Sequence, residues 1–78
     1  MYFKRLRDLR EDHELKQESI AHILNITRQQ YGLYEIGKRT IPIDLLMKLS
    51  ENYDVSIDYI VGISNYKKIR DKIKIEQK

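Results

Sequence analysis

The sequence predicts an all-α fold, a compact five-helix bundle that contains a helix-turn-helix. Apolar residues recur three and four positions apart along most of the chain, as they do on the buried face of a helix. No stretch of useful length alternates apolar and polar residues as a strand does, and residues that cap or stop helices lie between the apolar stripes. The 78 residues are enough for one small domain with a modest core.

The composition excludes several classes of protein. The chain is 41% hydrophobic and 35% charged, which is too apolar for a disordered chain and too charged for a membrane protein. No apolar run reaches the length of a transmembrane helix, so we expect neither a membrane span nor a signal peptide. Cysteine is absent, and this favours a cytoplasmic domain that is held together by packing.

Charge is distributed unevenly along the chain. The net charge is +2 over residues 1–40, −3 over residues 41–66 and +4 over residues 67–78. A polarised chain of this kind is compatible with one surface that faces phosphate, and equally with a solvated surface of mixed charge.

The first two helices are separated by a break in the apolar pattern at residues 13–16. The first is expected to end near Asp12, and its inner face carries Phe3, Leu6, Leu9 and Arg10. The second is expected to begin near Gln17, and its inner face carries Ile20, Ala21 and Leu24. Asn25 follows, and asparagine is one of the few non-glycine residues that readily adopt left-handed backbone geometry, so we expect the helix to end there.

The third helix has a signal at each end. Thr27 can cap it, because the hydroxyl can accept a hydrogen bond from an unpaired amide two or three residues later. Tyr31 and Tyr34 share its inner face, and Gly37 stops it. We expect both tyrosines to pack against the core.

Two further helices complete the predicted domain. Pro42 stands where a helix can begin without losing a backbone donor, and the inner face of the fourth helix then carries Leu45, Leu46, Leu49 and Tyr53. Ser56 caps a short fifth helix and Gly62 ends it. The predicted helix-turn-helix domain is residues 1–62.

Residues 63–78 form a basic C-terminal tail with two open interpretations. Tyr66, Ile69 and Ile73 lie at helical spacing and would give a sixth helix. Such a helix, of about 12 residues, is marginal without a packing partner and would suit a dimer interface. The alternative is a basic tail that is attracted to phosphate.

Residues 17–36 point to DNA. Two helices of about eight residues are joined by the tight turn 25–27, so the second must project its outer face from the domain. Ala21 is small enough for the two helices to approach closely, and Ile26 fills the space between them.

The outer face of the third helix is rich in groups that form paired hydrogen bonds. It carries Arg28, Gln29, Gly32 and Leu33. Arginine pairs with the O6/N7 edge of guanine, glutamine pairs with the N6/N7 edge of adenine, and a leucine can pack on a thymine methyl. Because a recognition helix enters the major groove by its N-terminal end, residues that read bases belong in its first turn.

These features resemble the lambda-repressor-like helix-turn-helix proteins, which include the phage Cro and CI repressors and the XRE group of bacterial regulators. The resemblance covers residues 3–62. The segments that carry it are residues 17–21 (QESIA), 24–31 (LNITRQQY) and 34–39 (YEIGKR), Pro42, and residues 55–62 (VSIDYIVG). Each segment alone is a weak signal, whereas their order and spacing together are specific.

The resemblance implies a role for each matching residue. Gln17 would grip a DNA phosphate at the start of the second helix, and Lys38 and Arg39 would hold phosphate beyond the third. Arg10 and Glu35 would form an internal ion pair that braces the first helix against the third. The residues that would touch bases or the edge of the groove are Arg28, Gln29 and Leu33 for the bases, and Thr27 and Gln30 for the edge.

Three positions depart from the family pattern. Lys16 stands where a Ser or Thr often caps the second helix, and Ile36 stands where an Asn that reaches phosphate is common. Ile41 makes the connector longer than the shortest in the family. Because a lysine side chain cannot accept a hydrogen bond from a backbone amide, we expect the second helix to begin without a side-chain cap at Lys16.

The predicted function is that of a small transcriptional repressor, not an enzyme, which binds a palindromic double-stranded DNA operator as a homodimer. The sequence contains no catalytic set, glycine-rich phosphate loop or metal-ligand cluster, so we expect no cofactor, metal or small-molecule ligand. The alternative is an antitoxin or an accessory protein-interaction module of the same fold. Such a module would carry an apolar stripe on the outer face of the third helix, where this chain has polar residues and Leu33.

Overall fold

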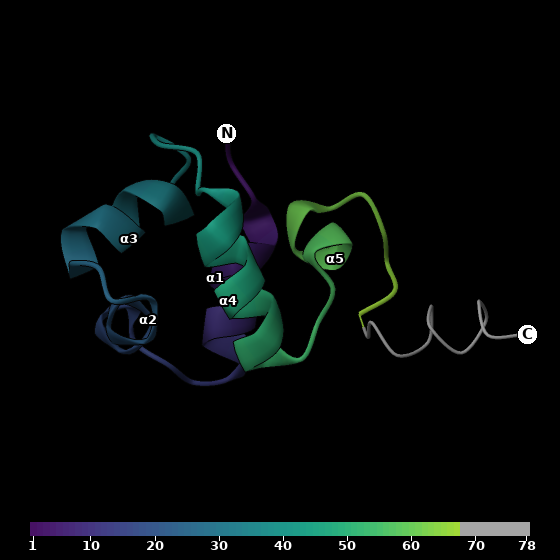
Figure 1. Ribbon diagram of the computed structural model, residues 1–78, viewed down its shortest axis with the longest axis horizontal. Helices are drawn as coiled ribbons and strands as arrows, with labels where there is room; N and C mark the ends of the chain where they lie inside the picture. The colour runs from purple at the N-terminus through teal and green to yellow at the C-terminus, as the bar shows by residue number, and fades with distance from the viewer. Residues whose placement is uncertain (68–78) are drawn as a thin grey trace, which may run out of the picture.

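A computed structural model describes residues 1–67 of the chain, and over these residues it contains five α-helices and no strand (Figure 1). The helices are α1 (Lys4–Asp12), α2 (Gln17–Leu24), α3 (Arg28–Glu35), α4 (Ile43–Tyr53) and α5 (Ile57–Val61). The predicted all-α class is confirmed, and a tight turn joins α2 to α3 as a helix-turn-helix requires.

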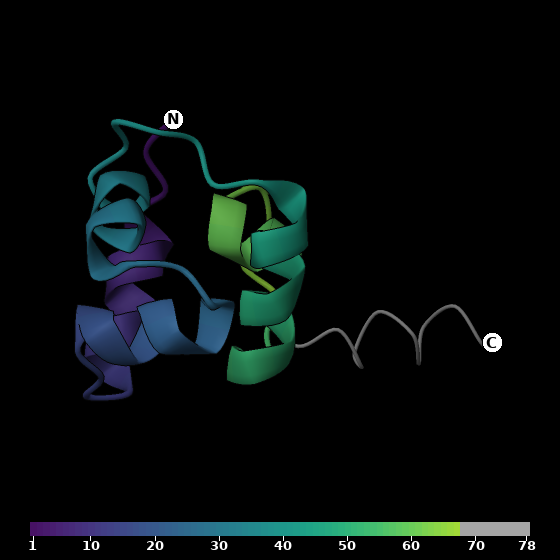
Figure 2. The same cartoon turned by 60° about the vertical axis from the view of Figure 1, so that its left-hand side comes forward.

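The helices pack around one core. In Figure 1, α2 and α3 lie together at one end, α5 lies at the other, and α1 and α4 lie between them. Figure 2 shows α4 and α5 on one side of the molecule and the first three helices on the other. α3 is therefore a peripheral helix that packs mainly on α2 and leaves one face open. Within the described part of the chain, no helix has the length and apolar character needed to cross a membrane.

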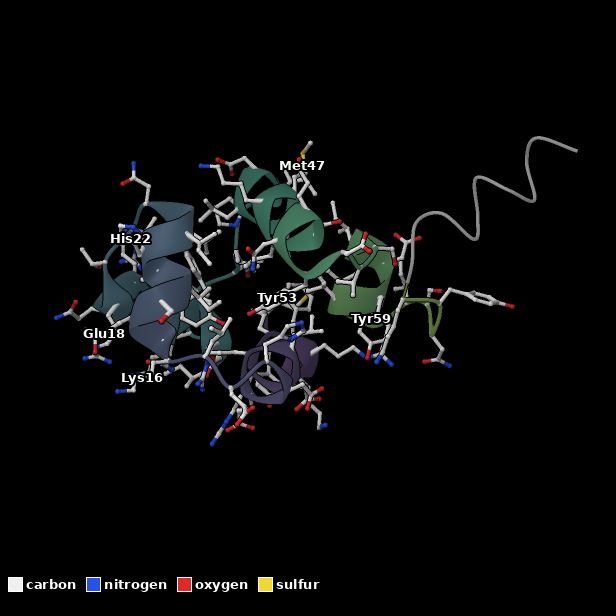
Figure 3. The ribbon with its side chains drawn as sticks, turned by 90° about the horizontal axis from the view of Figure 1, so that it is seen from below. Lys16, Glu18, His22, Met47, Tyr53 and Tyr59 are labelled. Carbon is white, nitrogen blue, oxygen red and sulfur yellow. The ribbon has the colours of Figure 1, made fainter. Side chains whose placement is uncertain are left out.

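The core contains apolar side chains from every helix. Figure 3 shows Tyr53 pointing into the middle of the molecule between α4 and α1, whereas Glu18 and His22 on α2 point outward. Ile41 and Val55, which precede and follow α4, are buried as well, so both connectors of α4 are tied to the core. The buried apolar residues are Leu6, Leu9, Ile20, Ala21, Leu24, Tyr31, Ile41, Leu45, Leu46, Leu49, Tyr53, Val55 and Ile60.

The helix ends follow the local signals in the sequence. Asn25 ends α2 with a left-handed φ of 59°. The hydroxyls of Thr27 and Ser56 accept hydrogen bonds from backbone amides in the first turns of α3 and α5. Lys16 precedes α2 without a side-chain cap, as expected.

Residues 63–67, which follow the predicted end of the domain, are hydrogen-bonded to it. Arg5 on α1 donates to the backbone oxygens of Tyr59 and Ser64, both at 2.8 Å. The Arg5 guanidinium also lies 4.0 Å from the centre of the Tyr59 ring, within the range of a cation–π contact. The polar contacts of the domain thus continue past Gly62. The predicted sixth helix lies mostly outside the described residues.

The left-handed glycine at the end of α3 gives the first prediction. Gly37 has a φ of 81°, and a Cβ at this position would lie 2.8 Å from the Cβ of Tyr2. Gly37→Val should therefore lower the free energy of unfolding by about 1–3 kcal/mol through backbone strain, and by more if Tyr2 cannot move. Chemical denaturation would measure the change.

Gly62 provides a matched control for this substitution. Its φ is 90°, but a Cβ there would meet no atom within 4 Å. Gly62→Val should therefore show the strain without the collision and lose less stability. If Gly37→Val unfolded at the same denaturant concentration as the parent, Gly37 would not end α3 in this way.

Candidate nucleic-acid interface

The first turn of α3 is held in place by a capping box. The Thr27 hydroxyl accepts a hydrogen bond from the Gln30 backbone amide at 3.1 Å, and the Gln30 side-chain oxygen accepts one from the Thr27 amide at 3.3 Å. These bonds satisfy amide groups that the start of a helix leaves unpaired. They fix the backbone from which the exposed side chains of Arg28 and Gln29 project.

The two glutamines of this turn differ in the groups that they leave free. Gln30 uses its side-chain oxygen in the capping box, so only its amide N–H groups remain for a ligand. Gln29 is exposed, and its side chain makes no hydrogen bond within residues 1–67. Because paired recognition of adenine needs one donor and one acceptor, Gln29 is suited to a base and Gln30 to a phosphate oxygen.

The outer face of α3 offers little apolar surface. Leu33 lies one turn after Gln29, is half-buried, and does not belong to the apolar cluster of the core. Tyr31 and Tyr34 face inward, where Tyr31 is fully buried and Tyr34 packs against the core. The face therefore lacks the apolar stripe of a helix that docks on another protein.

Arg28 is held by a side chain of α2. Its Nη1 atom donates to Oε1 of Gln17 at 3.3 Å, and Nε2 of Gln17 donates to Oε1 of Glu35 at 3.1 Å. Gln17 is half-buried, and these two bonds use its oxygen and one of its N–H groups. One N–H group of Gln17 remains available for a phosphate.

Arg10 and Glu35 form the ion pair that the family resemblance implies. Nε and Nη2 of Arg10 lie 2.8 and 2.9 Å from the two carboxylate oxygens of Glu35, and Nη1 donates to the backbone oxygen of Leu15 at 2.9 Å. Only 14% of the Arg10 side chain and 4% of the Glu35 side chain are exposed. The pair ties α1 to the last turn of α3.

The carboxylate of Glu35 stays charged despite its burial. Burial opposes ionisation, but the stabilising contacts of the carboxylate, of which the hydrogen bond from Arg10 is the strongest, outweigh it, and the pKa of Glu35 lies below its usual 4.5. A fixed negative charge therefore stands behind the outer face of α3.

The Lys38–Arg39 loop is fastened to the end of α3. The backbone amide of Arg39 donates to the backbone oxygen of Leu33 at 3.2 Å. On the far side of the loop, the Met1 nitrogen donates to Oγ1 of Thr40 at 2.8 Å. Lys38 and Arg39 are exposed, and no ion pair among residues 1–67 neutralises them. The loop thus presents two free cations beside α3.

Two features of this surface were not predicted from the sequence. One is the link from Glu35 through Gln17 to Arg28, which joins residues of α2 and α3 that no local pattern connects. The other is the difference between Gln29 and Gln30. The difference between Gln29 and Gln30 could have been predicted, because the Thr-x-x-Gln spacing from Thr27 to Gln30 is that of a capping box.

Comparisons with known proteins agree with this geometry. A helix-turn-helix family profile matches residues 6–60. YobD, an uncharacterized HTH-type transcriptional regulator of Bacillus subtilis, is 43% identical over 65 residues, which are 83% of this chain and 58% of YobD. The chain thus spans little more than half of the length of YobD. RstR, the transcriptional repressor of the cryptic phage CTXphi in Vibrio cholerae, is 30% identical over 96% of this chain and 70% of RstR.

A solved structure has the same arrangement of helices. The crystal structure of a transcriptional regulator from Listeria innocua matches 92% of this chain and 67% of its own, with a TM-score of 0.72 and 28% identity. These proteins are regulators of transcription, which agrees with the prediction that the chain is not an enzyme. The chain belongs to the lambda-repressor-like helix-turn-helix family of transcriptional regulators.

Proposed function

We propose that this protein is a small repressor that binds a palindromic DNA operator as a homodimer, with α3 of each copy in the major groove. The observation that carries the proposal is the first turn of α3. It is exposed and polar, its backbone is fixed by the capping box, and its helix is braced by the buried pair of Arg10 and Glu35. A capped helix start with exposed hydrogen-bonding side chains suits direct readout of base edges in the major groove.

The side chains of this surface divide into base and backbone contacts. Arg28, Gln29 and Leu33 are assigned to bases, because they project from the outer face of α3. The groups assigned to phosphate are the free N–H of Gln17, the Thr27 hydroxyl, the amide of Gln30, and the cations of Lys38 and Arg39. Phosphate contacts set the position on the duplex, and base contacts set the sequence preference.

Repression would follow from occupancy of the operator. A two-fold protein matches a two-fold operator, with half-sites about 34–36 Å apart, one helical turn of DNA. The assignment as a repressor is supported by RstR, the relative that is itself a phage transcriptional repressor. The alternative, a protein-interaction module, is disfavoured by the polar outer face of α3.

Selection of binding sites from random duplexes, followed by titration at several salt concentrations, tests the proposal. We expect a palindromic site. If each half-site engages roughly 3–5 phosphates, the log–log slope of affinity against salt for a dimer should be about −5 to −9. A duplex of the same composition with scrambled half-sites should bind more weakly. Absence of binding to any duplex at low salt would refute DNA recognition, and a non-palindromic site would refute the dimer.

A further inference from the structure

Ile36 is a large apolar residue that the fold leaves exposed at the end of α3. It is the C-cap residue of the helix, and 60% of its surface is exposed. It belongs neither to the apolar cluster of the core nor to the residues that pack against that cluster. Single exposed isoleucines are common on protein surfaces, so the meaning of this one depends on where it lies.

The helical phase places Ile36 on the outer face of α3. Its φ of −89° and ψ of −2° are right-handed, and its amide donates to the backbone oxygen of Gly32 at 3.1 Å, so it continues the helix by one residue. It follows Gln29 by seven residues and Leu33 by three, which is the spacing of residues that share one face of a helix. The outer face therefore changes along its length from hydrogen-bonding side chains in the first turn to apolar side chains at the end.

The backbone after Ile36 returns to α3. Gly37 turns the chain with a φ of 81°, and the amide of Arg39 then donates to the backbone oxygen of Leu33 at 3.2 Å. The Lys38–Arg39 loop is thus held against the end of the helix. Ile36 lies between the side chains assigned to bases and the cations assigned to phosphate.

The major groove offers one apolar group to such a side chain. Isoleucine forms no side-chain hydrogen bond or ion pair, so phosphates and polar base edges cannot be its ligands. In unmodified DNA the remaining group is the 5-methyl of thymine. The C5 atom of a pyrimidine lies on the part of the base edge that is nearest the backbone of its own strand. An apolar residue between base contacts and phosphate contacts is suited to this methyl group.

We propose that Ile36 is a specificity-determining residue that packs on the methyl group of a thymine in the operator. This inference rests on the proposed function and deepens it, because it adds a base contact at the end of α3 to those assigned to the earlier turns. Burial of the methyl group against the isoleucine removes apolar surface from water and is favourable. Since only some base pairs place a methyl group there, the contact contributes to sequence preference.

Loss of this contact has an effect distinct from loss of a phosphate contact. Ile36→Ala should weaken operator binding about 3- to 5-fold per half-site, the value of burying roughly one methyl group, and should weaken random duplex less. An apolar contact releases no counterion, so the salt slope should stay that of the parent, whereas Lys38→Ala should make it shallower.

Replacement of each operator thymine in turn by deoxyuridine removes only the methyl group and tests the contact directly. At one position, deoxyuridine should weaken binding of the parent about 3- to 5-fold and should lose most of this effect in Ile36→Ala. Ile36→Val keeps a branched apolar side chain and should retain the effect. Ile63→Ala is a matched control, because Ile63 is 76% exposed but follows α5, at the opposite end of the molecule from α3 (Figure 1).

The same methyl group occurs in 5-methylcytosine, so a second pair of duplexes distinguishes the two bases. With a C·G pair at the sensitive position, methylation of the cytosine should strengthen binding of the parent and leave Ile36→Ala unchanged. A gain would extend the contact to any 5-methylpyrimidine, and absence of a gain would restrict it to thymine as proposed. Equal effects of deoxyuridine on the parent and on Ile36→Ala at every thymine would overturn the proposal.

Sedimentation without DNA separates a base contact from a contact between two copies of the chain. Ile36→Ala and the parent should have the same monomer–dimer equilibrium. A shift of that equilibrium, together with equal weakening on all duplexes, would assign Ile36 to a protein interface and overturn the proposal. Operator binding without a methyl effect that depends on Ile36 would refute this inference alone, whereas absence of binding to any duplex would refute the proposed function itself.

Discussion

Replacement of Arg10 by alanine should lower the free energy of unfolding by about 3–5 kcal/mol. Removing the guanidinium leaves the Glu35 carboxylate buried, with 4% of its side chain exposed, and without its charged partner. The hydrogen bond from Gln17 remains but cannot neutralise the charge. The backbone oxygen of Leu15 also loses the donor that ties the α1–α2 connector. The midpoint of chemical denaturation at neutral pH measures the loss.

Two further variants test whether the unpaired charge of Glu35 causes the loss of stability in Arg10→Ala. Arg10→Met with Glu35→Leu removes both charges and should be less destabilised than Arg10→Ala alone, because replacing a buried pair by apolar residues is often tolerated. Arg7→Ala breaks the exposed pair with Glu11, which has a distance of 3.1 Å, and should have little effect. An unchanged midpoint for Arg10→Ala would mean that the pair does not brace the fold.

The same pair gives the stability a pH dependence. The pKa of Glu35 is lowered by folding, so its contribution to stability is complete above the usual value of 4.5. That contribution is lost as the pH falls through the folded pKa. In Arg10→Ala the carboxylate loses its main stabilising partner and its pKa should rise. The stability difference between variant and parent should therefore narrow in acid.

The parts of the fold that depend on local chemistry were predictable from the sequence. Asn25 and Gly37 end helices through their own left-handed backbone conformation, and Thr27 caps a backbone amide three residues later. Residue type and position were therefore enough to place the ends of α2 and α3. The apolar stripes were predictable for the same reason, because helical spacing alone decides which residues share a face.

The parts that depend on contacts between distant segments were not predictable. Arg5 looks like one more exposed cation of α1, and its bonds to Tyr59 and Ser64 exist only because α5 packs beside α1. Ile41 lies in a connector without periodicity, so nothing local marks it as buried. The candidate site also combines features that are fixed by local sequence with features that are fixed by contacts between distant segments. Its surface residues follow from the pattern of α3, whereas the orientation of the Gln17 amide depends on a carboxylate that is fixed by α1.

The second large effect is expected on DNA recognition. Substitutions on this surface should distinguish side chains that contact bases from side chains that contact phosphate. Arg28→Ala or Gln29→Ala should cost about 1–3 kcal/mol on the selected operator and relax the preference at one or two base pairs. Both side chains start from the first turn of α3, the part of a recognition helix that reaches base edges. Gln29 is free of hydrogen bonds within residues 1–67, and Arg28 keeps two nitrogen atoms for a base.

Lys38→Ala or Arg39→Ala should instead weaken operator and random DNA alike. These cations lie beyond the end of α3, in a loop fastened by the bond from Arg39 to Leu33, and they are assigned to phosphate. Each lost phosphate contact should make the salt slope shallower by about one unit. Arg28→Ala also removes one positive charge, so net charge alone cannot produce a difference between Arg28→Ala and either loop variant. The comparison needs the operator, each single-base variant and random duplex at several salt concentrations. If Arg28→Ala and Lys38→Ala gave the same sequence-independent loss, α3 would not read bases, and the basic edge of the domain would act only as a non-specific attraction for DNA.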